Sequence, residues 1–494
     1  MQKIRRQIEP NSSPKKEALD YQKRAVEEVK DLQYSAIFHE QGLGKTKIAI
    51  DLTLYWLDKK MIDVVLLVTK KGLIRNWQKE LKFHTHITPK ILDDSRAKNF
   101  YVFNSPARIM LTNYEVLRSE EDRFKIFLKT RDVAVILDES AKIKNPDSAI
   151  TKVFFELSPL FKKRIIMTGT PIANRPYDLW SQIKFLDGGE SLGDDFDTFK
   201  RNNDLSNDLV FDKDKKEEFE NSLANIFGKI EKFSVREVKS SGVVTLPEKI
   251  YENIITDWER LQYEMYEQVR EQLKTVIIKN GIPEEDSSED VLKRLLRLVQ
   301  ITSNPQLVDH SYQSEPGKMP YLIDLLEKIK INHEKAIIWT TFTHNADWLC
   351  DRLKEFGTCK LHGKMGMEAR NSSVERFLIE PEVKVLIATP GAAKEGLTLT
   401  VANHVIFYDR SFSLDDYLQA QDRIHRISQT RVCFIHNLIM PDSIDIWIDK
   451  LLNAKQLAAQ LGQGDMSLEE YKSKISYDFG TIIKDILKKS NGSH

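Results

Sequence analysis

Nine short apolar runs constrain the possible fold of this chain more than any other feature of its sequence. Each run is rich in β-branched residues and is apolar throughout, instead of alternating with polar residues. Runs of this kind are typical of strands that are buried on both faces in a parallel sheet. Helical patterns separate the runs, which predicts βαβ units. The runs fall into two series, at 35–41, 63–70, 108–114, 133–140 and 164–170, and at 335–342, 383–390, 404–410 and 432–439.

The segment between the two series has a different character. Residues from about 190 to 320 are strongly charged and carry helical patterns, such as the one at 256–280. A chain of 494 residues is too long for one ordinary domain and long enough for two or three. We therefore predict two α/β domains with a mostly helical insertion or bridge between them, and a helical tail at the C-terminal end.

The first run leads into a glycine loop, and a helical pattern follows. Open α/β sheets bind ligands at this place, beyond the carboxyl end of a strand. Gly42 and Gly44 would let backbone N–H groups surround phosphate oxygens. Lys45 would reach the terminal phosphates of ATP, and Thr46 would hold Mg²⁺ through its hydroxyl. The strict phosphate-loop pattern has a glycine where this chain has His39, and a Gly-Lys turn without a ligand is the alternative.

An acidic pair ends the run at 133–140. Asp138 would position Mg²⁺, and Glu139 would orient and deprotonate the water that attacks ATP. A solvated acidic strand end is the alternative. Because the glycine loop and the acidic pair each follow an apolar run, together they favour ATP hydrolysis, with ATP and Mg²⁺ as cofactors.

The segment 417–430 of the second series carries basic residues at a helical spacing. Arg423 and Arg426 are three residues apart, so they would share one face if the segment is helical, and Gln419 lies one turn earlier. Two arginines that face a phosphoryl group could stabilise the charge that develops during its transfer. A solvated basic helix face is the alternative.

Composition and charge argue against several other classes of protein. The chain has no apolar run near 18 residues, and its N-terminus lacks the apolar core of a signal peptide, so we expect a cytoplasmic protein that does not enter a membrane. Its three cysteines form no CxxC pair, which argues against a zinc site or a disulfide framework. Lys+Arg and Asp+Glu both number 74, so a nucleic-acid site must be a local basic surface.

Taken in order, these motifs resemble those of the SNF2-like branch of the superfamily 2 helicase-related ATPases. The resemblance covers about residues 18 to 445, and the segments GTPIANRPYDLW and QDRIHRISQ are especially characteristic. The matching segments are LDYQKRAV (19–26) for the Q motif, HEQGLGKT (39–46) for motif I, LLVTKKGLIRNWQKEL (66–81) for motif Ia, LTNYEVL (111–117) for motif Ib, DESAKIKN (138–145) for motif II, MTGTPIANRPYDLW (167–180) for motif III, VLIATPGAAKEGLTLTVANHVIFYDRSF (385–412) for motif V and its continuation, and QAQDRIHRISQ (419–429) for motif VI.

The resemblance implies an α/β protein with two RecA-like parallel-sheet lobes and ATP in the cleft between them. Gln22 of the Q motif would contact the adenine, and Gln419 would belong to the nucleotide-binding residues. The expected domains are an N-terminal tail (1–17), a first lobe (18–188), a helical insertion and linker (189–315), a second lobe (316–445) and a C-terminal helical tail (446–494).

The resemblance also implies a partner. Proteins with this layout track along double-stranded DNA, usually without separating its strands, and contacts with the DNA backbone give register without sequence specificity. The residues matched to such contacts are Lys70, Thr112, Thr341 and Thr389. Each of these threonines could equally be a hydrogen-bonded hydroxyl at a strand end. We therefore expect a monomer that binds double-stranded or branched DNA, with residues 190–310 as a possible site for a protein partner.

The sequence departs from the family pattern at motif II, where Ala141 stands in place of the usual histidine. Alanine cannot hydrogen-bond toward motif III, so the coupling between ATP and DNA is expected to be weaker or to be rebuilt elsewhere. The chain carries no recognisable accessory module, which favours a bacterial or phage protein over a nuclear one.

Three functions remain open at this stage. The first is a DNA-dependent ATPase that translocates along duplex DNA and remodels DNA or DNA–protein complexes. The second is a helicase that separates strands or remodels forks. The third is an ATP-binding nucleic-acid sensor or regulatory subunit of a larger complex, and the departure at Ala141 keeps that alternative open.

Overall fold

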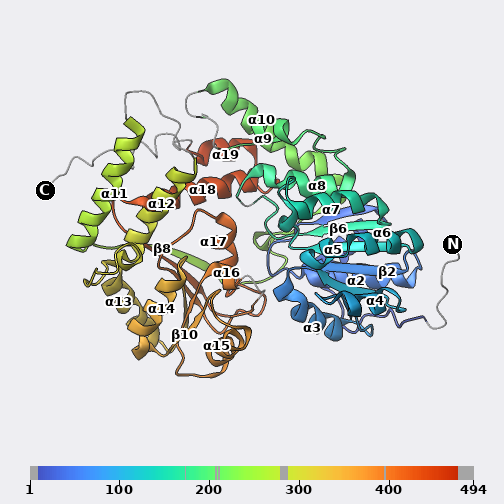
Figure 1. Ribbon diagram of the computed structural model, residues 1–494, viewed down its shortest axis with the longest axis horizontal. Helices are drawn as coiled ribbons and strands as arrows, with labels where there is room; N and C mark the ends of the chain where they lie inside the picture. The colour runs from blue at the N-terminus through green and yellow to red at the C-terminus, as the bar shows by residue number, and fades with distance from the viewer. Residues whose placement is uncertain are drawn as a thin grey trace. The chain divides into compact units, whose positions relative to one another are not determined.

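The computed structural model describes residues 9–172, 174–205, 209, 212–278, 288–393 and 397–476. Residues 1–8 and 477–494, which are parts of the two expected tails, lie outside these ranges. The chain divides into two compact units (Figure 1). Unit 1 comprises the chain up to Thr245 together with Ala458–Ser473, and unit 2 contains Leu246–Leu457. The domain boundaries expected from the sequence stay predictions.

Unit 1 is built on a seven-stranded parallel sheet. Its strands are β1 (Tyr34–Ile37), β2 (Val64–Thr69), β3 (Lys90–Ile91), β4 (Ile109–Asn113), β5 (Val133–Asp138), β6 (Lys163–Met167) and β7 (Ser234–Val235). Their order in the sheet is β3-β4-β2-β5-β6-β1-β7. All five apolar runs of the first series form strands, as predicted, and β2 is buried at every position. β3 and β7 have two residues each and are too short to produce a periodic signal.

Helices cover this sheet. They are α1 (Asp20–Val29), α2 (Lys45–Asp58), α3 (Ile74–His84), α4 (Arg96–Phe103), α5 (Tyr114–Ser119), α6 (Glu121–Thr130), α7 (Ala149–Leu157), α8 (Trp180–Asp187), α9 (Phe196–Asn202) and α10 (Lys213–Ile230). Apolar side chains of α1, α2 and α3 share a core with alternate strand residues, such as Val65 and Leu67 of β2. The alternation follows from the two-residue period of a strand. α5, α6, α7 and α8 form a second connected group.

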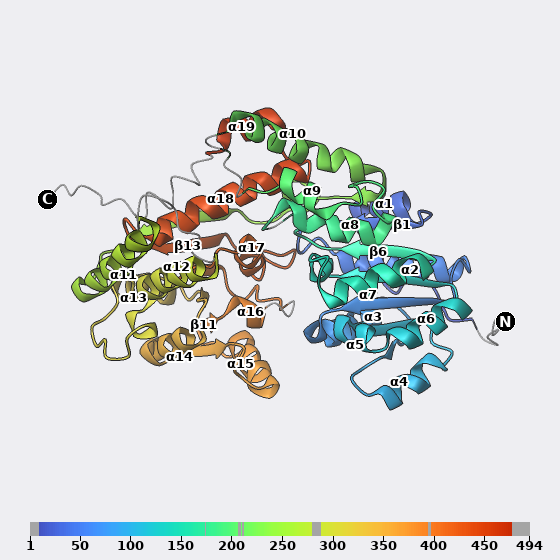
Figure 2. The same cartoon turned by 45° about the horizontal axis from the view of Figure 1, so that its top comes forward.

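Unit 1 is completed by residues from the C-terminal part of the chain. Residues 458–473 include the end of α18 (Ile444–Gly462) and most of α19 (Leu468–Lys474). Asp465 forms an ion pair with Arg236, in which Oδ1 lies 2.6 Å from Nε. Tyr471 is fully buried, and α19 lies beside α10 in Figure 2. The helical character expected for this part of the chain is confirmed for its described residues.

Unit 2 contains a second parallel sheet, with the order β10-β11-β9-β12-β13-β8. Its strands are β8 (Lys249–Ile255), β9 (Ala336–Trp339), β10 (Thr358–Leu361), β11 (Val385–Ala388), β12 (His404–Phe407) and β13 (Cys433–Ile439). The four runs of the second series form β9, β11, β12 and β13, as predicted. β8 lies inside the segment expected to be mostly helical. It is an edge strand with an exposed centre, so it lacks the apolar run that marks a central strand.

The helices of unit 2 bury both faces of its sheet. They are α11 (Arg260–Ile278), α12 (Ser288–Ser303), α13 (Lys318–Ile331), α14 (Thr343–Arg352), α15 (Met367–Ile379), α16 (Pro390–Ala393), α17 (Leu414–Gln421) and the first part of α18. Successive residues of β9 point to different cores: Ile337 packs with α15, and Ile338 packs with α13 and α14. Within the described ranges, no helix is both long and apolar enough to cross a membrane.

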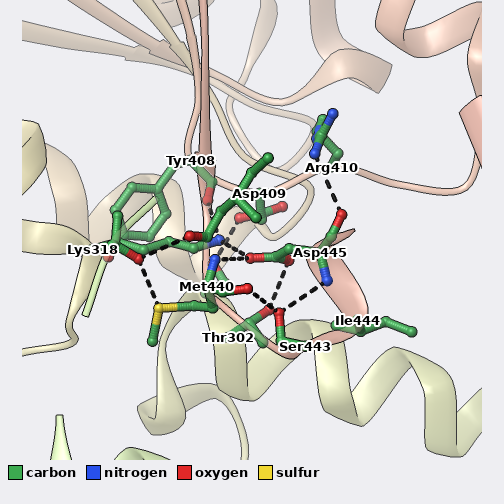
Figure 3. Close-up of polar contacts among 12 residues, drawn as sticks. Thr302, Lys318, Tyr408, Asp409, Arg410, Met440, Ser443, Ile444 and Asp445 are labelled. Carbon is green, nitrogen blue, oxygen red and sulfur yellow. Dashed lines mark hydrogen bonds and ion pairs between the residues drawn. The ribbon is translucent and has the colours of Figure 1, made fainter. Parts of the chain in front are cut away.

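A buried ion pair joins α13 to α18 within unit 2 (Figure 3). Nζ of Lys318 lies 2.6 Å from Oδ2 of Asp445, and the two side chains are 0% and 4% exposed. The ammonium also donates to the backbone oxygen of Tyr408, at 2.9 Å. The carboxylate accepts from the hydroxyl of Thr302 and from the backbone N–H of Met440, each at 3.1 Å. A charge this deep is tolerable because it is both paired and hydrogen-bonded.

We predict that Lys318→Met destabilises unit 2 by about 3–5 kcal/mol, because it leaves the Asp445 carboxylate buried without its counter-charge. Urea unfolding, followed by hydrogen exchange of the unit 2 strands, measures the change. Lys328→Met, on the exposed side of the same helix, is the matched control and should change stability little. The double change Lys318→Met with Asp445→Asn should cost less than the sum of the single changes. Additive costs would contradict the pairing.

Candidate functional site

The strand order of unit 1 places the motif-bearing loops next to one another. β2, β5, β6 and β1 are consecutive and parallel, so the loops that follow them leave from one edge of the sheet. That edge, at the carboxyl ends of the strands, is where open α/β sheets bind ligands. The loops carry Lys70 after β2, Asp138 and Glu139 at β5, Thr168-Gly169-Thr170 after β6, and the glycine loop after β1.

The glycine loop turns tightly between β1 and α2. Gly42 and Gly44 have φ values of 90° and 75°, in the left-handed region that residues with a Cβ rarely adopt. A Cβ on Gly44 would lie only 2.3 Å from Nε2 of Gln22, so the amide of Gln22 would have to move away from the loop. α2 begins at Lys45, and the free N–H groups at a helix N-terminus favour an anion. The loop therefore has the geometry of a phosphate site.

Lys45 is held at the centre of this loop. Its Nζ donates to the backbone oxygen of His39 at 2.9 Å and to Oε1 of Gln41 at 3.2 Å. A Cβ on Gly169 would lie 3.1 Å from the same Nζ, so motif III packs directly on the lysine. Burial, together with the nearby ammonium of Lys45, lowers the pKa of His39 to about 4. The imidazole is therefore neutral near pH 7 and adds no positive charge beside Lys45.

Gln22 lies buried against the glycine loop. Its Nε2 donates to the backbone oxygen of Leu43 at 3.3 Å, and the hydroxyl of Tyr21 donates to the same oxygen at 3.0 Å. Its Oε1 accepts the backbone N–H of Leu19 at 3.0 Å, which closes the first turn of α1. Gln22 is thus beside the expected nucleotide, and its contact with adenine stays a prediction.

Asp138 is oriented by side chains from the end of β2 and from α3. Nε1 of Trp77 donates to its Oδ2 at 2.8 Å, and the hydroxyl of Thr69 donates to the same oxygen at 3.0 Å. The hydroxyl of Tyr114 donates to its backbone oxygen at 2.8 Å. Burial and the adjacent carboxylate of Glu139 raise the pKa of Asp138, while the hydrogen bonds from Trp77 and Thr69 oppose that rise. The hydrogen bonds therefore fix the direction of the Asp138 carboxylate. A positive charge beside it would stabilise its ionised form.

These donors fit Mg²⁺. The ion prefers oxygen ligands and is usually held by one or two protein groups together with phosphates and water. Asp138 offers a carboxylate whose ionisation burial disfavours, so a divalent cation beside it would offset that cost. Thr46 offers a hydroxyl in the first turn of α2, next to the phosphate loop. These two residues would hold the ion, which would neutralise charge on the phosphates.

Glu139 has a left-handed backbone conformation, with φ of 55°, which residues other than glycine rarely adopt. Strain of this kind clusters at functional sites. Oε2 of Glu139 lies 3.4 Å from Nζ of Lys70. The next residue, Ser140, donates to Oε1 of Gln182 on α8 at 2.7 Å, which joins motif II to the helix that follows motif III. Ala141 is half-buried in the short turn that follows.

The condition under which Arg423 and Arg426 would share one helix face is not met, because the segment that carries them is not helical. α17 ends at Gln421, and both arginines lie in the turns that follow it. The reason is a tertiary hydrogen bond. The backbone oxygen of Arg423 accepts from the backbone N–H of Leu399, at 2.9 Å, where a continued helix would use an intrahelical partner. Arg423 is 2% exposed, whereas Arg426 is half-buried.

Neighbouring residues of unit 2 fix the side chains around motif VI. Nε of Arg426 donates to the backbone oxygen of Asp422 at 2.9 Å, and one terminal nitrogen donates to the hydroxyl of Thr398 at 2.8 Å. Gln419, on α17, is buried and donates to Asp415 at 2.9 Å. Each of these contacts lies within unit 2, so the roles of these residues toward a nucleotide stay predictions.

The threonines matched to DNA contacts differ in accessibility. Thr112 has no exposed surface, and its hydroxyl lies 3.4 Å from the backbone oxygen of Leu92, so a phosphate cannot reach it in this conformation. Thr389 is 6% exposed. Thr341 is half-buried, and its backbone N–H donates to Asp409 at 2.7 Å. The alternative of a satisfied hydroxyl therefore holds for Thr112, and contacts by the other two stay predictions.

Comparison with known families agrees with this geometry. The model for the SNF2-related domain matches residues 21–307, which is more than half of the chain. The chain belongs to the SNF2-related family. The model for the helicase conserved C-terminal domain matches residues 317–428. The resemblance expected from the motifs is therefore confirmed, and so is the fold of two parallel-sheet lobes.

Individual relatives come from bacteria and eukaryotes. An uncharacterized ATP-dependent helicase of Mycoplasma pneumoniae is 28% identical over 451 residues, which cover 88% of this chain and 41% of the relative. The ISWI chromatin-remodeling complex ATPase ISW2 of Saccharomyces cerevisiae is 25% identical, with 88% and 40% covered. The Sulfolobus solfataricus SWI2/SNF2 ATPase core, solved in complex with dsDNA, is 26% identical, with a TM-score of 0.43 and coverage of 95% and 99%. The chain spans about two fifths of the length of the curated relatives it matches.

Sequence reasoning missed the side chains that hold motif II in place. Trp77 lies 61 positions before Asp138, and Thr69 lies 69 positions before it, so no local spacing connects them. Tyr114 follows β4 and looks like an ordinary strand-end aromatic. A signal was available for Trp77, because a buried indole usually needs a hydrogen-bond acceptor.

We predict that Trp77→Phe weakens Mg²⁺ binding in the presence of an ATP analogue by about tenfold, because residues that orient a metal ligand typically contribute 10–100-fold. Phenylalanine keeps the aromatic packing and removes only the donor to Asp138. Titration of Mg²⁺ with a fluorescent ATP analogue measures the change. Trp56→Phe is the matched control, since Nε1 of Trp56 donates instead to the backbone oxygen of Lys30. Equal Mg²⁺ affinity in both variants would contradict the role of Trp77.

Proposed function

We propose that this chain is an ATP hydrolase of SNF2 type that uses ATP to move along double-stranded DNA and thereby remodels DNA or DNA-bound proteins. The observation that carries the ATPase part is the meeting of the glycine loop, Asp138 and Glu139 at one edge of the unit 1 sheet. The conformations of the glycine loop and of Glu139, and the hydrogen bonds of Asp138, support these proposed roles. A glycine turn without a ligand, or a solvated acidic strand end, would not require the other features to lie at the same edge.

The chemistry follows from these residues. The N–H groups of the glycine loop and the ammonium of Lys45 would bind the β- and γ-phosphates of ATP. Thr46 and Asp138 would hold Mg²⁺. Glu139 would accept a proton from the water that attacks the γ-phosphorus, and ADP would leave. Trp77 would keep the Asp138 carboxylate directed toward the ion. Arg423 and Arg426 are proposed to stabilise charge on the transferred phosphoryl group.

The DNA part of the proposal is supported by the family and by the names of relatives. A Bacillus subtilis relative, 29% identical over 440 residues, is named as a helicase/translocase. The yeast relative is named as the ATPase of a chromatin-remodeling complex. A motor that tracks along a duplex needs contacts with phosphates and no base contacts. Lys70, which leaves the same sheet edge as Glu139, is the basic residue best placed to combine DNA binding with hydrolysis.

A regulatory ATP-binding subunit is the second candidate function, because one observation favours it. Ala141 replaces the histidine with which motif II of the family usually reaches motif III, so turnover could be indifferent to DNA. In that case a partner protein would bind the chain, with residues 190–310 as the proposed surface. A strand-separating helicase remains the third candidate. We expect the protein to be monomeric and cytoplasmic.

We predict that duplex DNA stimulates ATP hydrolysis, and that the stimulation increases with duplex length, because a tracking motor stays bound longer on a longer track. Steady-state hydrolysis is measured without nucleic acid and with single-stranded DNA, blunt duplex, forked DNA and RNA. Glu139→Gln should bind ATP and not hydrolyse it, whereas Lys45→Ala should lose nucleotide affinity. A rate that ignores every nucleic acid would favour the regulatory subunit, and strand release from the fork would favour the helicase.

We also predict that Arg426→Ala binds ATP with near-normal affinity and turns over about 10³-fold more slowly, the lower range for an arginine that stabilises phosphoryl transfer. Nucleotide binding and hydrolysis are measured separately on the same preparation. Arg352→Ala is the matched control, because Arg352 is half-exposed and pairs with Glu315. Parent-like turnover in Arg426→Ala would show that motif VI does not act on the phosphates.

A further inference from the structure

We infer that the ion pair between Lys70 and Glu139, called the latch below, restrains ATP hydrolysis. A DNA phosphate that binds Lys70 would break this ion pair and remove the restraint. The inference rests on the proposed function, because it takes Glu139 as the base and DNA as the partner. It goes further by naming the contact through which DNA would control the base.

The geometry places one basic side chain on the catalytic carboxylate. Nζ of Lys70 lies 3.4 Å from Oε2 of Glu139, within hydrogen-bond distance. The two residues are 69 positions apart, and the pairing of β2 with β5 brings them together. Both follow directly from strand ends, so their backbones are fixed by the sheet. The contact is therefore a product of the fold and not of a flexible surface.

The contact with the Lys70 ammonium would hinder Glu139 as a general base. The carboxylate must accept a proton from water, and the bound ammonium occupies one of its two oxygens. Breaking the pair would free that oxygen to contact the attacking water. The left-handed backbone conformation of Glu139 sets the position of its Cβ. The direction of the carboxylate then depends on the contacts that the carboxylate makes. Lys70 is one of them.

Lys70 is also accessible to an outside anion. Its side chain is 31% exposed, whereas that of Glu139 is 15% exposed. A phosphate can therefore approach the lysine from solvent while the carboxylate stays in the site. A phosphate in solvent would draw the ammonium outward, away from the Glu139 carboxylate. Contact with a phosphate then weakens contact with Glu139, which makes the two interactions compete.

The latch lies next to the departure in motif II. Ala141 is two residues from Glu139 and has no polar group with which to pass a signal from DNA. A lysine that responds to phosphate would supply the missing link between DNA binding and hydrolysis. The opposite role is also testable, because a lysine that merely held Glu139 in its working direction would make hydrolysis slower when removed.

The first experiment measures hydrolysis without DNA. We expect Lys70→Met to raise the DNA-free rate about two- to fivefold, the range that a partly exposed ion pair supports. Lys70→Arg keeps a cation beside Glu139 and should raise the DNA-free rate less than Lys70→Met does. Lys71→Met is the matched control, since the neighbouring Lys71 pairs with Asp94 at 2.7 Å and should leave the DNA-free rate unchanged. An unchanged or lower rate in Lys70→Met would overturn the latch.

The second experiment measures DNA affinity without nucleotide, so it does not depend on turnover. If DNA and Glu139 compete for Lys70, then removing the carboxylate charge must strengthen DNA binding. We expect Glu139→Gln to bind a blunt duplex about two- to fivefold more tightly than the parent at low salt. The gain should vanish in the Lys70→Met background and shrink as salt is raised. Equal gains with and without Lys70 would overturn the competition.

The two proposals fail in different ways. If duplex DNA does not stimulate the parent, the proposed translocase is wrong whatever Lys70 does. If DNA stimulates the parent but neither variant shows the expected change, the motor stands and the latch is wrong. If Lys70→Met raises the DNA-free rate while Glu139→Gln leaves DNA affinity unchanged, the pair restrains hydrolysis and DNA does not release it, which overturns the inference as stated.

Discussion

The position of β5 between β2 and β6 is the constraint on which the rest of unit 1 depends. Its residues pair in parallel with both neighbours, from Val133 opposite Val64 to Asp138 opposite Met167. A shift of the register by one residue would turn every side chain to the other face of the sheet. Asp138 would then lose Trp77 and Thr69, and Glu139 would lose its position beside Lys70. The apolar packing of the strand thus sets the electrostatics of the site.

The sequence predicted those features of the fold that come from burial on both faces. Nine central strands, the glycine loop and the acidic pair could all be predicted, because continuous apolar runs and turn-forming glycines are local signals. β8 could not be predicted, because the sequence of an edge strand with an exposed centre resembles that of a polar loop. The side chains that orient Asp138 were hidden for another reason: the sheet topology, and not the spacing along the chain, brings them together.

Two details show where tertiary structure overrides a local pattern. Arg423 and Arg426 have helical spacing, but a hydrogen bond from Leu399 ends the helix before them. Thr112 has a polar side chain next to a strand end, but the sheet buries it completely. In both cases a partner distant in sequence decided the outcome. The glycine loop could be predicted without knowledge of distant partners, because its glycines and the start of the following helix lie within a few consecutive residues.

Unit 1 is assembled from two separate segments of the chain, and this affects the order in which the protein can fold during synthesis. Residues 9–245 leave the ribosome first, but Asp465 and the buried Tyr471 complete the unit only after all of unit 2 has been made. Nascent domains generally fold as units, in order from the N-terminus. Unit 1 therefore stays incomplete until residues 458–473 have been made. A ribosome that stops after motif VI and before Ala458 releases a chain that carries every ATP motif but lacks the residues that complete unit 1.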